Sequence, residues 1–241
     1  MNPSIQSLQD RTVVVIGRGS GIARAITDAS RAAGARVVVA GRDRPALAWA
    51  YDDPDIRAEE VDLNDEVSIA SLAQRLGAVD HVVSTASARA RGHVRDLDRE
   101  ALRRSFDTKV IGPIMMAKHF TPHIGVGGSL VLFSGVAAFK PTVGYLGVAV
   151  TNGAVDFLTR SLALELAPVR VNTVSPGVVD TGAWDGLGEQ GKRDYFESQR
   201  ERNPVRRIGT VEDIATAVLF AMTNTFMTGA TLRIDGGEPL T

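Results

Sequence analysis

A glycine-rich turn near the N-terminus carries the clearest chemical signal in the sequence. The stretch VIGRGSGIAR (15–24) follows a β-branched run and opens a helical pattern. Gly17 permits a tight turn there, and Gly21 lets the helix N-terminus approach a diphosphate, whose charge is favoured by free backbone N–H groups and the helix dipole. The pattern therefore predicts a dinucleotide site built from consecutive residues, namely Gly17, Arg18, Gly19, Ser20, Gly21 and Ile22.

The residues that follow the second apolar run select between the two nicotinamide dinucleotides. NAD sites usually place a carboxylate there to accept from the ribose hydroxyls, whereas NADP sites place an arginine that pairs with the 2′-phosphate. The run ends VVVAGRD, with Arg42 at its tip, and Arg18 could reach the same phosphate. This arrangement favours NADP(H). Asp43 is the counter-indication, because a register displaced by two residues would make it the ribose acid.

Apolar runs that alternate with helical patterns predict the elements that carry these residues. Strands are expected at 12–17, 36–41, 56–63, 80–85, 128–134, 169–175 and 230–235. Helical periodicity is clearest at 20–35, 66–76, 98–119, 149–166 and 211–223. Strands buried on both faces and separated by helices indicate a parallel, doubly wound, Rossmann-like sheet. Because no linker or repeat interrupts the pattern, we expect one α/β domain over residues 1–241, with helices on both faces of the sheet.

The least regular stretch of the chain is 181–210, which is rich in glycine and carries Trp184, Tyr195 and Phe196. An insertion of this length in a compact α/β domain is often a substrate lid. The alternative is an ordinary surface helix and loop.

Several motifs in the same order resemble the short-chain dehydrogenase/reductase family over nearly the whole chain. The matching pieces are the glycine turn, VDL (61–63), VNTVSPG (171–177) and the TG…DGG ending (228–237). The resemblance implies an NADP(H)-dependent oxidoreductase of a carbonyl or alcohol substrate. It also implies that Asp62 holds the adenine amino group and that Thr181 lies near the nicotinamide carboxamide. Further cofactor contacts are implied for residues around the same crevice: Leu63, Thr85, Ala86, Lys109, Asn152, Pro176, Gly177 and Val179.

The catalytic positions depart from the family pattern. The family uses a serine that holds the substrate oxygen, a tyrosine as general acid/base, a lysine that lowers the tyrosine pKa and binds ribose, and an asparagine that completes a proton relay. The serine is the second of a Ser-Ser pair, and here the pair reads Ser134-Gly135. Val148 stands at the tyrosine position, and it cannot donate a proton. Lysine and asparagine have exchanged places, with Lys109 for asparagine and Asn152 for lysine, so one ammonium and one amide are retained.

Tyr145 is a candidate for the missing phenol. It precedes Asn152 by seven residues, so the two share a helix face if the helix begins early enough. They would then be roughly 10 Å apart along the axis, at about 1.5 Å per residue. A tyrosine on a loop could also fold inward, and the alternative is a surface or subunit-interface residue. The catalytic candidates are therefore Lys109, Ser134, Tyr145 and Asn152.

Three functions stay open on this pattern. The first is an NADP(H)-dependent oxidoreductase with a rearranged acid/base group. The second is a dinucleotide-binding sensor or scaffold without redox turnover, and the third is a non-redox cyclase or lyase. The SPG loop beside the nicotinamide and the lid favour the first, because adenine binding alone needs neither.

Composition limits the partners of the chain. Its 27 basic and 28 acidic side chains give a net charge of −1, which argues against nucleic acid or an anionic membrane as the main partner. The arginines within 89–104 and 200–207 are interrupted by acids and are interpreted as solvated surface. Asp156 and Glu165 are interpreted in the same way.

No metal site is expected. The chain has no cysteine, and the one histidine pair with helical spacing, His119 and His123, is interrupted by Pro122 and lacks the glutamate of a zinc-protease helix. The N-terminus MNPSIQSLQDR lacks a long apolar leader, and no apolar stretch is long enough to span a membrane, so a soluble, cytoplasmic protein is expected. The wide apolar face of 145–166 predicts a homodimer or homotetramer.

Overall fold

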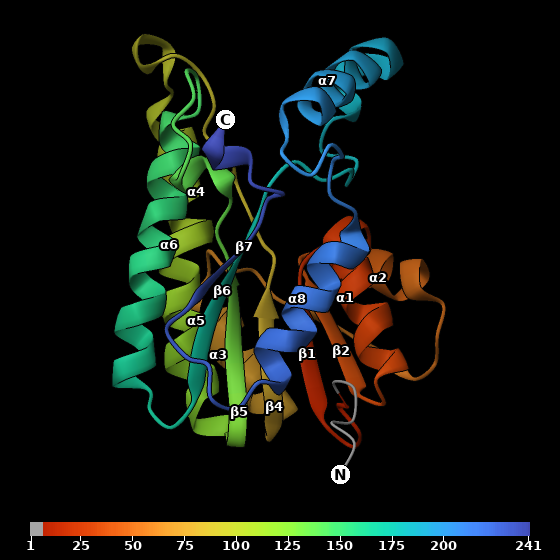
Figure 1. Cartoon of the computed structure of the whole chain (residues 1–241). Helices are drawn as coiled ribbons and strands as arrows, with labels where there is room; N and C mark the ends of the chain where they lie inside the picture. Colours follow the sequence, from red (N-terminus) through yellow and green to blue (C-terminus); the bar gives the residue numbers. More distant parts are fainter. Residues whose placement is uncertain (1–6) are drawn as a thin grey trace.

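The predicted strands form one parallel sheet in the order β3-β2-β1-β4-β5-β6-β7 (Figure 1). The computed structural model describes residues 7–241, so the first six residues of the stretch expected to lack a leader lie outside it. The strands are β1 (Thr12–Ile16), β2 (Arg36–Gly41), β3 (Ile56–Glu60), β4 (Val79–Ser84), β5 (Ile124–Phe133), β6 (Arg170–Pro176) and β7 (Thr231–Ile234). Each neighbouring pair runs parallel, which confirms the doubly wound fold class.

Helices cover both faces of the sheet because each central strand is apolar on both sides. In β1, Val13 and Val15 pack into one core, whereas Val14 and Ile16 pack into the other, as the two-residue period of a strand requires. The first core lies under α1 (Gly21–Ala32), α2 (Arg44–Tyr51) and α8 (Val211–Thr223). The second lies under α3 (Glu66–Leu76), α5 (Gly112–Phe120) and α6 (Leu146–Glu165). Among the helices of the described chain, none has the length and apolar character needed to cross a membrane.

The predicted helix 98–119 is interrupted. It consists of α4 (Arg99–Phe106), a π-helical turn (Asp107–Ile111) and α5. Single π-helical turns inside helices are frequent at functional sites because they change the direction in which side chains project. The turn at 107–111 contains Lys109, which is buried.

The stretch 181–210 is more regular than its glycine content predicts, since α7 (Gly188–Arg202) occupies half of it. The helix is mostly charged and buries only Phe196, so it stands away from the two cores, beyond the carboxyl ends of the strands (Figure 1). Short 3₁₀ turns lie at Val94–Asp96, Thr121–His123, Val136–Ala138, Asp185–Leu187 and Glu238–Leu240.

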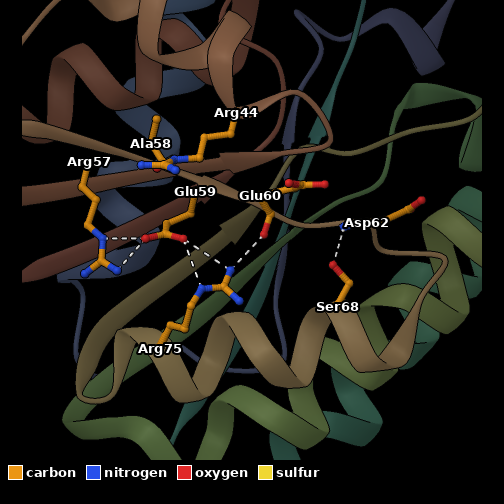
Figure 2. Close-up of polar contacts among 8 residues, drawn as sticks. All are labelled: Arg44, Arg57, Ala58, Glu59, Glu60, Asp62, Ser68 and Arg75. Carbon is orange, nitrogen blue, oxygen red and sulfur yellow. Dashed lines mark hydrogen bonds and ion pairs between the residues drawn. The ribbon is translucent and has the colours of Figure 1, made fainter.

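The edge strand β3 is protected by charged side chains (Figure 2). Glu59 is buried between two arginines: Arg57 donates to it at 2.6 Å, and Arg75 lies 3.3 Å away. Arg44 donates to the backbone oxygen of Ala58 at 3.0 Å. Charged groups along an edge strand oppose pairing with another chain. They also fix the strand that leads to Asp62.

The order of the strands locates the crevice of the molecule. The chain winds outward from β1 to β3, then returns to β4 on the other side of β1. In open α/β sheets, ligands bind outside the carboxyl ends of the strands at such a reversal. The glycine turn follows β1, Thr85 follows β4, Ser134 follows β5 and Gly177 follows β6. The predicted cofactor and catalytic residues therefore meet at one edge of the sheet.

Candidate cofactor and active site

The glycine positions of the turn between β1 and α1 leave little room for a side chain. A Cβ at Gly17 would lie 2.2 Å from the Thr85 hydroxyl, and one at Gly19 would lie 2.7 Å from the methyl group of Ala50. Gly21 has a φ of +58°, which favours glycine. Within the described chain, the Ser20 hydroxyl at the helix N-cap accepts no hydrogen bond from the first turn of α1, so the first N–H groups stay open. The turn therefore fits a bound diphosphate.

The tip of β2 presents an arginine rather than an acid. Asp43 is the N-cap of α2, and its carboxylate accepts from the Ala46 N–H at 2.9 Å. A side chain at Gly41 would be 2.8 Å from the Gly17 oxygen. Arg42 and Arg18 are exposed, and neither forms a hydrogen bond or ion pair with another residue in 7–241. Both guanidinium groups are therefore open to a phosphate, whereas Asp43 is engaged.

The segment after β3 carries Asp62, which the family resemblance predicts to hold the adenine. The backbone N–H of Asp62 donates to the Ser68 hydroxyl at 3.0 Å, and one carboxylate oxygen accepts from the Asn64 N–H at 2.9 Å. Figure 2 shows the Asp62 carboxylate pointing away from the charged network on β3. The neighbouring Leu63 is buried, and its backbone packs tightly against Gly112.

The loop after β6 packs against the glycine turn. Thr181 approaches Gly21 so closely that a Cβ there would be 3.2 Å from its backbone oxygen, and Val179 is buried. Gly177 donates to the Ile234 oxygen at 3.0 Å, which fixes the start of the loop. A cavity of about 520 Å³ lies between this loop, α1 and α8; its lining includes Ser20, Gly21 and Thr181 but none of the predicted catalytic residues.

Three of the four predicted catalytic residues form one hydrogen-bonded group. Lys109 is only 7 % exposed, and its ammonium donates to the Ser134 backbone oxygen at 3.2 Å. The Ser134 hydroxyl donates to the Asn152 backbone oxygen at 3.0 Å. The Asn152 amide in turn donates to the Gly135 oxygen at 3.3 Å. Lys109 and Asn152, the two residues whose exchange the sequence predicts, therefore lie on either side of Ser134.

Gly135 and Asn152 fit each other closely. A Cβ at position 135 would lie 2.9 Å from the Asn152 amide nitrogen, so the second serine of the family pair would require this amide to move. The Asn152 Oδ1 atom is buried and has no hydrogen-bond partner among the described residues. An unpaired buried acceptor costs on the order of 1–3 kcal/mol. A ribose hydroxyl of a bound dinucleotide would supply the missing donor, so this position also fits the cofactor.

The electrostatic surroundings of Lys109 make it weakly basic. Burial, followed by repulsion from Arg89, lowers the pKa of Lys109 to about 7, and Asp156 opposes that change. Burial raises the pKa of Asp156, although its carboxylate accepts from Thr231 at 3.1 Å. Asp156 is therefore not a solvated residue as expected, because it lies one helical turn after Asn152 and faces the same crevice. Glu165, farther along α6, is exposed.

Tyr145 lies apart from this group. It is the N-cap residue of α6 and is half-buried, with its ring 5.0 Å from the Arg91 guanidinium. Arg91 also lies 5.6 Å from the Trp184 ring, which stacks at 4.5 Å on Tyr195. No described hydrogen bond joins Tyr145 to Lys109.

Arg89 and Arg91 are both exposed, as the interpretation of 89–104 as solvated surface expects. They lie in the segment that follows β4, and the Arg91 guanidinium packs against the rings of Tyr145 and Trp184. Partial desolvation of its guanidinium, followed by repulsion from Arg91, lowers the pKa of Arg89. No acid occurs between Thr85 and Arg95 in the sequence. In 200–207, by contrast, Arg200 and Arg207 pair with acids at the surface.

Comparisons with known proteins agree with this architecture. The family model described as enoyl-(acyl carrier protein) reductase matches residues 16–238. A short-chain dehydrogenase/reductase, ucsE of an Acremonium species, is 31% identical over 253 residues, which cover 96% of each chain. A solved small-chain dehydrogenase in complex with NADPH has a TM-score of 0.84 and 30% identity, over 97% of this chain and 100% of the other. The reductase/Diels-Alderase MalC from Malbranchea aurantiaca has a TM-score of 0.89 and 27% identity, over 97% and 98%.

Proposed function

Because the chain belongs to the short-chain dehydrogenase/reductase family, we propose that it is an NADP(H)-dependent oxidoreductase of a carbonyl or alcohol substrate. The observation that carries the proposal is the buried group of Lys109, Ser134 and Asn152 at the crevice. It provides a titratable amine and hydrogen-bonding groups at the edge of the sheet where the glycine turn would hold a dinucleotide.

The preference for NADP(H) rests on the two open arginines. In the proposal Arg42 and Arg18 bind the 2′-phosphate, the glycine turn binds the diphosphate and Asp62 binds the adenine. A guanidinium–phosphate pair is charge-assisted and can be bidentate. The NADPH complex of the solved relative supports the same choice.

Lys109 takes the role of the proton donor in the proposed reaction. When bound, the nicotinamide supplies a hydride to the carbonyl carbon. As negative charge develops on the substrate oxygen, the Lys109 ammonium stabilises it and transfers a proton, which gives the alcohol. A donor acts best when its pKa is near the working pH, and the pKa of Lys109 is about 7. Val148 cannot serve, and Tyr145 lies with Arg91.

The test is a panel of aldehydes and ketones in which consumption of NADPH is followed by absorbance. We expect reduction of ordinary ketones, with Lys109 supplying the factor of about 10² to 10⁴ in rate that a positioned donor contributes. Tyr145→Phe should change the rate little. A large loss in that variant would instead assign proton transfer to Tyr145.

A second candidate is a non-redox cyclisation in the same crevice. It is favoured by the valine at position 148 and by the likeness to a protein whose name joins reductase and Diels-Alderase. Product formed without loss of NADPH would support it. If NADPH binds but neither redox turnover nor cyclisation occurs, the sensor or scaffold alternative is supported.

We propose that residues 181–210 close over the substrate. Trp184 and Tyr195 of this stretch extend toward Arg91 on the opposite wall, while α7 buries little of its own surface. Deleting the helix should raise the KM for a confirmed substrate while leaving NADPH binding intact.

The proposal includes a cytoplasmic homodimer or homotetramer. Along α6, Val150, Phe157 and Leu164 recur every seven residues, and they are 47%, 65% and 82% exposed. Such a stripe on one helix face is expected at a two-fold contact. Light scattering at micromolar concentration should give at least twice the chain mass, and a monomer would contradict this part of the proposal.

A further inference from the structure

The segment after β4 holds two arginines on a fixed backbone. Ala90, between them, is buried against α6, where a Cβ at Gly147 would come within 2.9 Å of its methyl group. Gly92 donates to the Gly144 oxygen at 2.9 Å, and the Ser105 hydroxyl donates to the Ala88 oxygen at 2.8 Å. Because these contacts hold the backbone on both sides of the segment, the Cα positions of Arg89 and Arg91 are defined.

Within residues 7–241, no acidic side chain forms an ion pair with either of these arginines. Neither forms a hydrogen bond or ion pair with any residue in the described range, whereas Arg31, Arg57, Arg75, Arg200 and Arg207 all pair with acids. Arg89 also experiences repulsion from Arg91, Arg18 and Lys109. Asp156 is the acid near Lys109, and Thr231 already binds it. A cluster of like charges at a crevice attracts an anion from solution.

Aromatic rings hold Arg91 without using its N–H groups. Its guanidinium lies 5.0 Å from the Tyr145 ring centre and 5.6 Å from that of Trp184. Trp184 is itself fixed by donation from its indole N–H to the Val179 oxygen at 3.1 Å. Stacking on aromatic rings leaves the edges of a guanidinium free for a carboxylate.

We propose that Arg89 and Arg91 bind a carboxylate of the substrate, so that the chain acts on an oxo acid or the corresponding hydroxy acid. This inference rests on the proposed oxidoreductase function for its reacting carbonyl, which lies on the Lys109 side of the arginines. The glycine turn and Arg42, which are carried by β1 and β2, are the groups proposed for the phosphates of a dinucleotide. Arg18 of that turn lies near enough to Arg89 to lower its pKa, so substrate binding and cofactor binding have to be separated by experiment.

The first test is binding, which does not depend on turnover. Calorimetry would compare 4-methylbenzoate with 4-methylbenzamide, each titrated into the protein saturated with NADP⁺. We expect the acid to bind about 10- to 100-fold more tightly, since charge-assisted hydrogen bonds are the stronger class. Arg89→Gln and Arg91→Gln should each remove most of this difference. Arg95→Gln, an exposed arginine on the same segment, is the matched control and should retain it. Equal binding of acid and amide by the wild type would overturn the inference.

The second test distinguishes binding of the substrate carboxylate from binding of a cofactor phosphate. If Arg89→Gln weakens NADPH binding as strongly as it weakens binding of the acid, the arginines serve a cofactor phosphate and the inference is wrong.

The kinetic test compares 4-carboxybenzaldehyde with methyl 4-formylbenzoate, which replaces the charged carboxylate with a neutral ester. We expect kcat/KM to favour the acid by about the same factor as the binding ratio. Equal reduction of both would leave the oxidoreductase proposal standing and reject the anion site. Consumption of neither, together with selective binding of 4-methylbenzoate, would reject redox turnover and retain the anion site.

Discussion

At the β1 end of the crevice, a backbone turn offers N–H groups to a phosphate, whereas at the β5 end the chemistry depends on side chains. In the turn, a Cβ at Gly17 or Gly19 would lie 2.2 or 2.7 Å from the nearest neighbouring atom, so glycine is favoured at both positions. Beside β5, Lys109 and Asn152 are both buried next to Ser134, and we propose that they have exchanged the roles of the family's lysine and asparagine. A site built from backbone tolerates few substitutions, while one built from side chains can be rearranged as long as its charge and hydrogen bonds are kept.

The largest effect is expected from removing the Lys109 amine beside β5. Lys109→Met should lower kcat for a confirmed substrate by about 10² to 10⁴, since it removes the proposed proton donor. NADPH affinity, measured by fluorescence, should fall far less than kcat. Lys118→Met is the matched control, because that lysine is exposed and pairs with Glu66 at 2.7 Å. Full activity of Lys109→Met would refute the exchange of roles.

The next effect concerns the phosphate end. Arg42→Ala should weaken NADPH binding by about 10- to 100-fold and leave NADH binding nearly unchanged, because only NADPH carries the 2′-phosphate. The neighbouring Arg44→Ala removes the same charge from the surface, yet Arg44 already donates to the Ala58 oxygen, so it serves as the control. Equal affinity of the wild type for both cofactors would contradict the assignment.

The pH dependence of the reduction rate tests whether Lys109 is the proton donor. The pKa of Lys109 is about 7, so reduction should slow by about tenfold per pH unit above that value, as the ammonium loses its proton. Two variants should move the midpoint of the pH–rate profile in opposite directions. Arg89→Gln removes a cation that repels the ammonium and should raise the midpoint. Asp156→Asn removes an anion that attracts the ammonium and should lower the midpoint. A midpoint unchanged in both variants would exclude Lys109 as the titrating group.

The smallest effect is on stability. The pKa of Lys109 falls from 10.5 to about 7 in the folded chain, so between these values the unfolded chain binds more protons. Stability therefore rises with pH across that window, and the cost of burying the amine is greatest at pH 7 and below. Lys109→Met should increase the Tm at pH 7 by about 2–4 °C or more, the shift produced by about 1 kcal/mol in a chain of this size. The gain should shrink toward pH 10, and a Tm below that of the wild type at pH 7 would be the contrary result.

The sequence predicted the fold and the phosphate turn because their causes are local. Alternating apolar runs determine strands and helices, and closely spaced glycines determine a turn, whatever lies elsewhere in the chain. The family resemblance and the doubly wound sheet were confirmed. The outer parts of the site depend instead on which strand end a residue follows. For that reason Asp156 was interpreted as a solvated residue, although it is half-buried and accepts a hydrogen bond from Thr231. Arg89 and Arg91 are exposed, as expected.

Two further differences have physical causes that a linear pattern conceals. The π-helical turn at 107–111 directs Lys109 inward, and its sequence looks like that of an ordinary helix. In 181–210 the glycines suggested a loop, but GKRDYFESQRER (191–202) contains enough helix formers to give α7 without an apolar stripe.

The close fit of Gly135 and Asn152 couples two positions that lie far apart in the chain. A Cβ at position 135 would begin 2.9 Å from the Asn152 amide nitrogen, so a side chain there requires the amide to turn away. Turning the amide would break its hydrogen bond to the Gly135 oxygen. The effect of a substitution at either position therefore depends on the residue at the other, and the two effects are expected to be non-additive.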